Sequence, residues 1–332
     1  MKVNIPWAVG LTIAMLGAAG LGGHTARVAG SNQDPAGCDA GSGRITIATG
    51  NSTGVYYVMG GAIARLVNAN TDIRAGASET GASVQNIQQL VKGDYDVAFS
   101  LADTADTAVK GTGKFTGPQK IASIGRIYPN YTQIVVRADS GIRSVADFKG
   151  KKISTGSPLS GTEAISLRLI EAAGLKESDV TRQRLDLTKT VDGMKDGSID
   201  GLVWSGGLPT SALTDLYTSV GAEKLRMIDP TPLLPAMKKK SAVYDTATVP
   251  AATYGMSEDV KTVAVPNVLL VRDDMPANLA CALTTLVFTQ QKALTAAHPA
   301  GKDIRLETAD KAEPIPLHPG SERALQQLRA KN

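Results

Sequence analysis

The sequence predicts an α/β protein that is long enough for two lobes, and three observations support this. Segments with the apolar pattern of a strand alternate with segments of helical periodicity along most of the chain. Polar, glycine-rich turns repeatedly connect a strand to the next helix. The chain has 332 residues, whereas single cores usually stop growing near about 250–300 residues. Such alternation favours parallel sheets that are covered by helices on both faces.

The predicted elements follow one another from residue 44 onwards. Val55, Met59 and Ile63 fall on one helical face, and Gly93 and Gly174 are typical residues for ending a helix. The predicted strands are 44–50, 95–100, 132–139, 151–157, 200–207 and 266–274, and the predicted helices are 55–67, 82–93, 144–150, 160–175 and 279–288.

The N-terminal segment is typical of an exported protein. Lys2 precedes an uncharged, mostly apolar stretch at 5–23, and small residues at 28–30 resemble a cleavage site. We interpret residues 1–30 as a signal peptide or an N-terminal anchor, since the stretch is nearly long enough to span a bilayer. Residues 31–43 are a predicted flexible linker. Both alternatives predict an extracytoplasmic location for the rest of the chain.

The chain has two cysteines, Cys38 and Cys281. Two cysteines in an exported protein can pair, so a disulfide is one prediction. The alternative is that Cys281, in an apolar helical stretch, is a buried small residue. Lipidation of Cys38 is a weaker alternative, because the leucine usual three residues earlier in a lipoprotein box is absent.

Charge and motifs argue against nucleic-acid binding and catalysis. The formal net charge is only +4, and His298 and His318 both stand beside prolines near the C-terminus. No CxxC or HExxH motif occurs in the sequence. The turn GNSTG at 50–54 has the GxSxG spacing around Ser52, but no histidine or lysine base is nearby in sequence. We therefore expect no enzyme activity, no metal and no cofactor. A serine-dependent enzyme using Ser52 or Ser160 is the alternative, but neither serine has a base nearby in sequence.

Three polar turns follow predicted strands at 49–54, 156–163 and 204–210. Ligands of open α/β sheets bind at the carboxyl ends of strands. Helix starts at these turns present unpaired N–H groups, which attract anions. The turns therefore predict a cleft for an anion.

Several segments resemble one family in their order along the chain. They are "TIATGNSTGVYYVMGGAIARLVN" (46–68), "GASVQNIQQLVKGDYDVAFSLAD" (81–103), "IVVRADSGIRSVADFKGKKISTGSPLSGTE" (134–163), "GLPTSALTDL" (207–216), "VPAATYGMSEDVKTVAVPNVLLVRDDMP" (249–276) and "PIPLHPG" (314–320). The ordered set resembles the TAXI-type solute-binding proteins of TRAP (tripartite ATP-independent periplasmic) transporters.

The resemblance implies a two-lobed type II periplasmic-binding fold, with a mostly parallel sheet in each lobe and a hinge between them. One lobe is expected to combine residues 44–127 and 266–332, and the other is expected to be 128–265. The chain is expected to cross between them near 124–131 and 263–267.

The resemblance also implies a function. The protein is expected to capture a small organic anion, a glutamate-like amino acid or a dicarboxylate, and deliver it to a TRAP-type membrane permease. We expect a monomer that binds no nucleic acid. The alternative is a ligand sensor of the same fold that docks on a receptor kinase.

The ligand-binding residues implied by the resemblance lie mostly in the polar turns and at helix starts. They are Thr49, Gly50, Ser52, Thr53, Tyr57, Ser83, Asn86, Ser157, Ser160, Gly161, Thr162, Trp204 and Pro209. An alternative role for Ser83 and Ser160 is to cap their helices, and for Tyr57 it is to pack in the core. Many relatives have two glycines where this chain has Asn51 and Ser52, which leaves the identity of the ligand open.

Overall fold

Ten strands form one continuous sheet in residues 38–331, the part of the chain that the computed structural model describes. Their order is β2-β1-β3-β10-β4-β7-β5-β6, while β8 pairs with β4 and β9 pairs with β10. The predicted signal peptide or anchor and most of the predicted linker lie outside the described residues. The strands are β1 (Ser42–Ala48), β2 (Asp72–Ser78), β3 (Val97–Leu101), β4 (Ile121–Arg137), β5 (Lys152–Ser154), β6 (Thr181–Gln183), β7 (Gly201–Gly206), β8 (Leu225–Ile228), β9 (Asp245–Val249) and β10 (Val260–Arg272).

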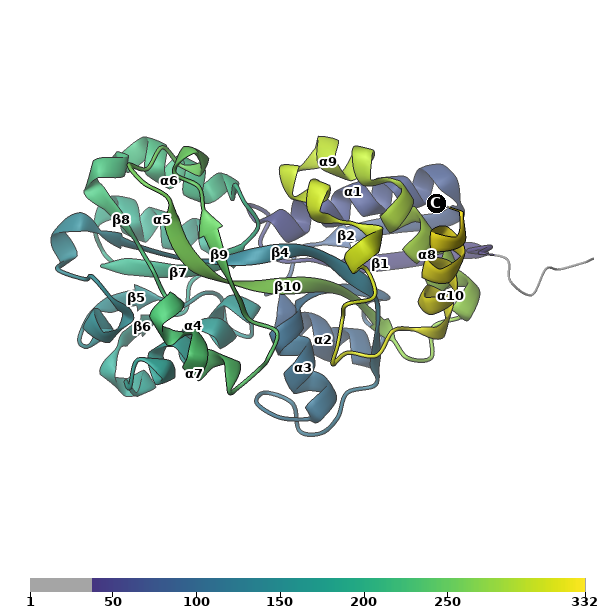
Figure 1. The fold of residues 1–332 in the computed structure, drawn as a ribbon, viewed down its shortest axis with the longest axis horizontal. Coiled ribbons are helices and arrows are strands. Elements are labelled where there is room, and N and C mark those ends of the chain that lie inside the picture. Colours follow the sequence, from purple (N-terminus) through teal and green to yellow (C-terminus); the bar gives the residue numbers. More distant parts are fainter. Residues whose placement is uncertain (1–37, 332) are drawn as a thin grey trace, which may run out of the picture. The chain divides into compact units, whose positions relative to one another are not determined.

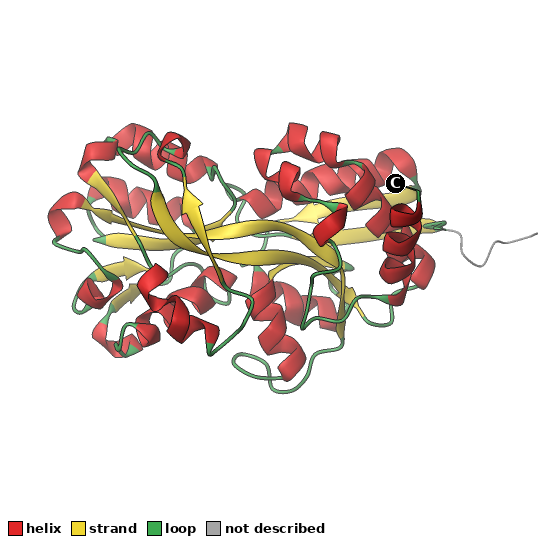
Figure 2. Cartoon of the chain, in the orientation of Figure 1, coloured by secondary structure: helices red, strands yellow, loops and turns green. Residues whose placement is uncertain are grey.

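Helices cover both faces of the sheet (Figures 1 and 2). Around β1–β3, α1 packs with α9 on one face and α2 packs with α3 on the other; around β5–β7 the corresponding pairs are α5 with α6 and α4 with α7. The helices are α1 (Val55–Asn70), α2 (Ser83–Lys92), α3 (Ala102–Lys110), α4 (Gly161–Ala172), α5 (Leu187–Asp196), α6 (Ser211–Val220), α7 (Leu234–Lys238), α8 (Ala277–Thr289), α9 (Gln291–Ala297) and α10 (Pro319–Ala330).

The outer strands are parallel as predicted, whereas the two long central strands make the sheet mixed. The parallel pairs are β1 with β2 and β3, and β5 with β6 and β7. In contrast, β4 and β10 are antiparallel to each other and to their other partners. The sequence pattern indicates only the second half of β4, because Gly125 and Pro129 are unusual within a strand.

Both predicted crossover segments lie within these long strands, which run side by side through the middle of the sheet (Figure 1). Pro129 of β4 stands opposite Pro266 of β10, and the register of the pair shifts between Pro266 and Val268. The division into lobes of 44–127 with 266–332 and of 128–265 remains a prediction.

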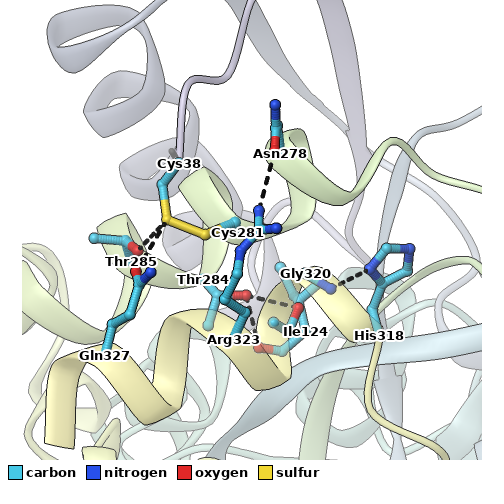
Figure 3. The surroundings of a disulfide bond; sticks show 11 residues. Cys38, Ile124, Asn278, Cys281, Thr284, Thr285, His318, Gly320, Arg323 and Gln327 are labelled. Carbon is cyan, nitrogen blue, oxygen red and sulfur yellow. Dashed lines mark hydrogen bonds between the residues drawn. A yellow bond between two sulfur atoms is a disulfide. The ribbon is translucent and has the colours of Figure 1, made fainter. Parts of the chain in front are cut away.

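Cys38 and Cys281 form a disulfide that joins residues 243 positions apart (Figure 3). Cys281 lies on α8 and is fully buried. On the same helix, the Thr284 hydroxyl is 3.2 Å from the carbonyl oxygen of Ile124 on β4 and 2.8 Å from the hydroxyl of Ser321 on α10. The disulfide thus holds the start of the described chain against a helix that is itself bonded to β4 and α10.

A buried ion pair joins α3 to α4. The carboxylate of Asp103, which is fully buried, contacts the guanidinium of Arg168, and both groups contact the hydroxyl of Tyr244. Burial alone would lower the pKa of Arg168, but Asp103 and Tyr244 raise it above its usual value. Arg168 is therefore a cation with a matched partner inside the protein.

Replacing Asp103 by Asn should lower the free energy of unfolding by about 3–5 kcal/mol, because it leaves the buried Arg168 charge without a counter-charge. Urea denaturation measures the change. Asp139→Asn is the matched control: it breaks the exposed Arg137–Asp139 pair, and a pair between exposed side chains contributes little to stability. Equal losses in the two variants would contradict a structural role for the buried pair.

Candidate functional site

The first residues of α1, α2 and α4 converge on one pocket in the middle of the described structure. The cavity volume is about 30 Å³. A single water needs about 10–15 Å³, so the pocket is narrow. Its lining residues are Gly50, Asn51, Gly54, Val55, Tyr56, Gly81, Ala82, Ser83, Leu101, Asn130, Ser157, Ser160, Gly161, Thr162, Trp204, Ser205 and Gly206.

Hydrogen bonds to the neighbouring strands β2 and β3 hold the turn from β1 into α1 in place. Thr49 is fully buried, and both its N–H and its hydroxyl donate to the carbonyl oxygen of Ser78, at 3.1 and 2.6 Å. The side-chain amide of Asn86 donates to the carbonyl oxygens of Thr49, at 2.7 Å, and Phe99, at 2.9 Å. These two polar side chains hold the turn against β2 and β3, so that the start of α1 points into the pocket.

The starts of α2 and α4 touch each other across the pocket. A Cβ atom at Gly161 would lie 2.6 Å from the hydroxyl of Ser83 and 2.5 Å from a methyl group of Leu101. Only glycine permits this approach. The N–H of Gln85 also donates to the carbonyl oxygen of Leu159 at 3.0 Å.

The pocket wall carries polar groups without partners. The N–H groups in the first turn of a helix have no acceptor within that helix, and three helices of at least ten residues begin here. The hydroxyls of Ser157 and Ser205 are buried and have no hydrogen-bond partner among the described residues. Buried polar atoms are nearly always satisfied in proteins, so these groups indicate a bound molecule or water.

A chain of hydrogen bonds connects the pocket wall to the two central strands. The Tyr56 hydroxyl donates to Asn267 Oδ1 at 2.5 Å, and Asn267 Nδ2 donates to Asn130 Oδ1 at 2.8 Å. Asn130 Nδ2 in turn donates to the carbonyl oxygen of Ser205 at 3.1 Å. Burial raises the pKa of Tyr56 above its usual value, so its phenol stays protonated as a donor.

No Asp, Glu, Lys, Arg or His is among the described residues that line the pocket. The nearest acid on α4, Glu163, is buried and contacts the guanidinium of Arg184, with a second oxygen 3.2 Å from Arg184 Nη2. The favourable electrostatic term for an anion therefore comes from helix starts and neutral donors rather than from a formal charge.

The structure places the predicted site residues in three groups. Seven of the thirteen line the pocket: Gly50, Ser83, Ser157, Ser160, Gly161, Thr162 and Trp204. Thr49 and Asn86 lie beneath it and hold the turn. Ser52, Thr53, Tyr57 and Pro209 are outside its wall. The caps expected as alternatives are also present in part, since the Ser160 hydroxyl accepts the N–H of Glu163 at 2.9 Å.

The structure differs from the prediction at Tyr57, which is 38% exposed, whereas its neighbour Tyr56 is 8% exposed and lines the pocket. Tyr56 shares the buried helical face with Met59 and Ile63, and Tyr57 lies one position around the helix. Pro209 also lies outside; its carbonyl oxygen contacts His298 Nε2 at 3.0 Å.

Sequence reasoning missed Tyr56, Asn130 and Ser205 as lining residues. Helical periodicity contained the signal for Tyr56, because residues three and seven positions later are apolar and buried. Asn130 and Ser205 are brought to the pocket by pairing of β4 with β7, where Tyr131 stands opposite Gly206. No local pattern indicates that pairing.

No group of three or more His, Cys, Asp or Glu side chains in the described part of the chain could hold a metal ion. Within residues 38–331, no helix is both long and apolar enough to cross a membrane.

The model of the NMT1-like family matches residues 47–327 of the chain. A protein of Bordetella bronchiseptica RB50 is similar in structure with a TM-score of 0.55, 17% identity, and coverage of 86% of this chain and 98% of that one. PhnD1 of Prochlorococcus marinus, solved in complex with methylphosphonate, gives a TM-score of 0.53, 9% identity, and coverage of 87% and 97%. The periplasmic aliphatic sulphonate binding protein SsuA of Escherichia coli gives a TM-score of 0.47 and 14% identity, and the match covers 87% of this chain and 84% of that one.

The two similarities with TM-scores above 0.5 show the fold. The predicted α/β architecture of type II periplasmic-binding proteins is confirmed, with a mixed sheet in place of mostly parallel ones.

The stability of the protein should fall as the pH drops below about 6.5, because burial lowers the pKa of His298 below its usual value, with the Pro209 carbonyl acting in the opposite direction. Nδ1 of His298 accepts the N–H of Ala300 at 3.1 Å, which requires the neutral ring. The unfolded chain then binds a proton at a higher pH than the folded chain does. The stabilisation is complete above about pH 6.5 and is lost as the pH falls through the lower folded pKa.

Urea denaturation at pH 7.5 and pH 5 measures this effect. His318 has a pKa lowered by burial as well, so the comparison that isolates His298 is wild type against His298→Gln. The variant should lose less stability on acidification than wild type. An identical loss in both proteins would contradict the assignment.

Proposed function

Because this chain belongs to the NMT1-like family, we propose that it is a non-enzymatic, extracytoplasmic solute-binding receptor. Its ligand is a small organic anion, a glutamate-like amino acid or a dicarboxylate, bound in the pocket at the starts of α1, α2 and α4. The observation that carries the proposal is the set of unpaired donors there, with the hydroxyls of Ser157 and Ser205 among them.

The donor set suits an anion. Each helix start contributes N–H groups and the positive end of its dipole, an arrangement that binds phosphate, sulfate and carboxylate groups in proteins. The walls between the donors are apolar or aromatic, as in Val55, Leu101 and Trp204. PhnD1, which binds methylphosphonate, holds an anion within a similar fold.

The pocket is narrow because contacts cross it. The N–H of Leu187 donates to Asn51 Oδ1 at 3.2 Å, and the Ser211 hydroxyl donates to the carbonyl oxygen of Thr53 at 3.0 Å. These contacts join the proposed lobe 44–127 with 266–332 to the proposed lobe 128–265. A ligand enters when the lobes separate around β4 and β10, and closure then excludes water and strengthens the electrostatic attraction.

The proposed partner is a TRAP-type membrane permease, in accordance with the ordered sequence resemblance to TAXI-type proteins. The proposed receptor is a monomer, and it acts outside the cytoplasmic membrane. The seven residues implied by that resemblance that line the pocket form the proposed ligand site together with Tyr56, Asn130 and Ser205, and Thr49 and Asn86 support it.

Isothermal titration calorimetry with glutamate, glutamine, 2-oxoglutarate, C4 dicarboxylates and methylphosphonate tests the proposed function. At least one anion should bind with a dissociation constant in the micromolar range or below, as expected for a receptor that works at low solute concentration. Binding should be absent for a neutral analogue, such as dimethyl succinate in place of succinate or dimethyl 2-oxoglutarate in place of 2-oxoglutarate. If no anion binds to the purified protein, the proposed function is wrong.

Two neighbouring tyrosines provide a matched pair of variants. Tyr56→Phe removes the hydroxyl that donates to Asn267, and it should weaken binding of the ligand found by calorimetry about 5- to 10-fold, the effect of about one buried hydrogen bond. Tyr57→Phe alters an exposed ring and should leave the affinity unchanged. Thermal unfolding of both variants controls for loss of folding. A larger effect at Tyr57 than at Tyr56 would contradict the location of the site.

A further inference from the structure

Three hydroxyl oxygens of the pocket wall each accept a hydrogen bond from the backbone. The hydroxyl oxygens of Ser83, Ser160 and Thr162 accept the backbone N–H groups of Leu101, Glu163 and Ser205 at 3.1, 2.9 and 3.3 Å. A hydroxyl that accepts a hydrogen bond keeps its own proton to donate. These three groups therefore present O–H donors to the pocket.

The two side-chain amides of the pocket wall are oriented in the same way. Asn51 Oδ1 accepts the N–H of Leu187 at 3.2 Å, and Asn130 Oδ1 accepts from Asn267 Nδ2 at 2.8 Å. The oxygen of each amide is thus engaged by the protein. With the first-turn N–H groups of three helices and the unpartnered hydroxyls of Ser157 and Ser205, the pocket is rich in donors, and none of its lining side chains is a charged acceptor.

The acids near the pocket have partners too. Glu163 contacts Arg184 and accepts the N–H of Leu159 at 2.9 Å, and Asp103 contacts Arg168 and Tyr244. Glu79 is exposed, lies outside the pocket wall, and accepts the N–H of Ser52 at 2.8 Å. No carboxylate is therefore turned towards the pocket from the described residues around it.

From this asymmetry we infer that the ligand is an anion that carries no ammonium group, such as a 2-oxo acid or an unsubstituted dicarboxylate, and that the pocket rejects the corresponding α-amino acids. The inference rests on the proposed function and narrows it. An ammonium group brings three N–H donors and a positive charge. Burying it beside helix starts and donors, without a counter-charge, is strongly unfavourable.

Calorimetry with matched pairs tests this inference at pH 7.5. The pairs are 2-oxoglutarate with L-glutamate, succinate with L-aspartate, and methylphosphonate with aminomethylphosphonate. Within each pair the anionic group is the same and the second compound carries an ammonium. In every pair that binds, the compound without the ammonium should bind at least tenfold more tightly.

A pair of variants at Ser157 tests the physical cause. Ser157→Asp places a carboxylate at a position whose hydroxyl is unpartnered, and it should shift the preference towards the ammonium-bearing compound by at least tenfold. Ser157→Asn has nearly the same size without the charge and should keep the wild-type preference. Circular dichroism of both variants verifies folding, and the wild-type pairs test the inference even if Ser157→Asp does not fold.

The outcomes separate the two proposals. Equal or tighter binding of the amino compound within a binding pair overturns this inference, while the receptor function stands. Binding of only the ammonium-free members supports both. If none of the six compounds binds, the receptor function fails, and this inference fails with it.

Discussion

The first-turn N–H groups at the starts of α1, α2 and α4 are the constraint on which the rest of the site depends. A helix cannot satisfy these groups from within, and burial of the three starts in one pocket removes most of the water that would otherwise do so. The glycine at position 161 lets two of the starts touch. Thr49 and Asn86 use their side chains entirely to hold the third in place. The same constraint favours a ligand group that accepts hydrogen bonds and disfavours a group that only donates them.

Ion pairs near the pocket neutralise the carboxylates that would otherwise make it less favourable for an anion. Asp103 and Glu163 are both buried near it, and an unpaired carboxylate at either position would oppose the binding of an anion. Arg168 and Arg184 neutralise them from α4 and from the segment after β6. The Asp103–Arg168 pair also joins the proposed lobes on the side of α3 and α4, so one interaction contributes both to the shape of the pocket and to its potential.

Sequence patterns predicted those parts of the site that are local. Ser83, Ser160 and Gly161 stand at helix starts, and such starts have recognisable capping residues and glycines. The predicted ligand residue Tyr57 is exposed, whereas Tyr56 lines the pocket, because one position along a helix turns a side chain by about 100°. Asn130 and Ser205 were missed because their position depends on the pairing of β4 with β7, strands whose paired segments are about seventy residues apart in the chain.

The sequence by itself determined the α/β class, the polar turns after strands and the starts of the helices that line the pocket, because short-range periodicity and capping decide these features. The tertiary structure decided which starts meet, which hydroxyls and amides accept hydrogen bonds from other parts of the chain, and how β4 and β10 run through the sheet. These depend on contacts between distant segments, such as Asn267 with Tyr56 and Asn130. No local pattern encodes them, since strand pairing and the direction of a hydrogen bond are settled only when the whole chain has packed.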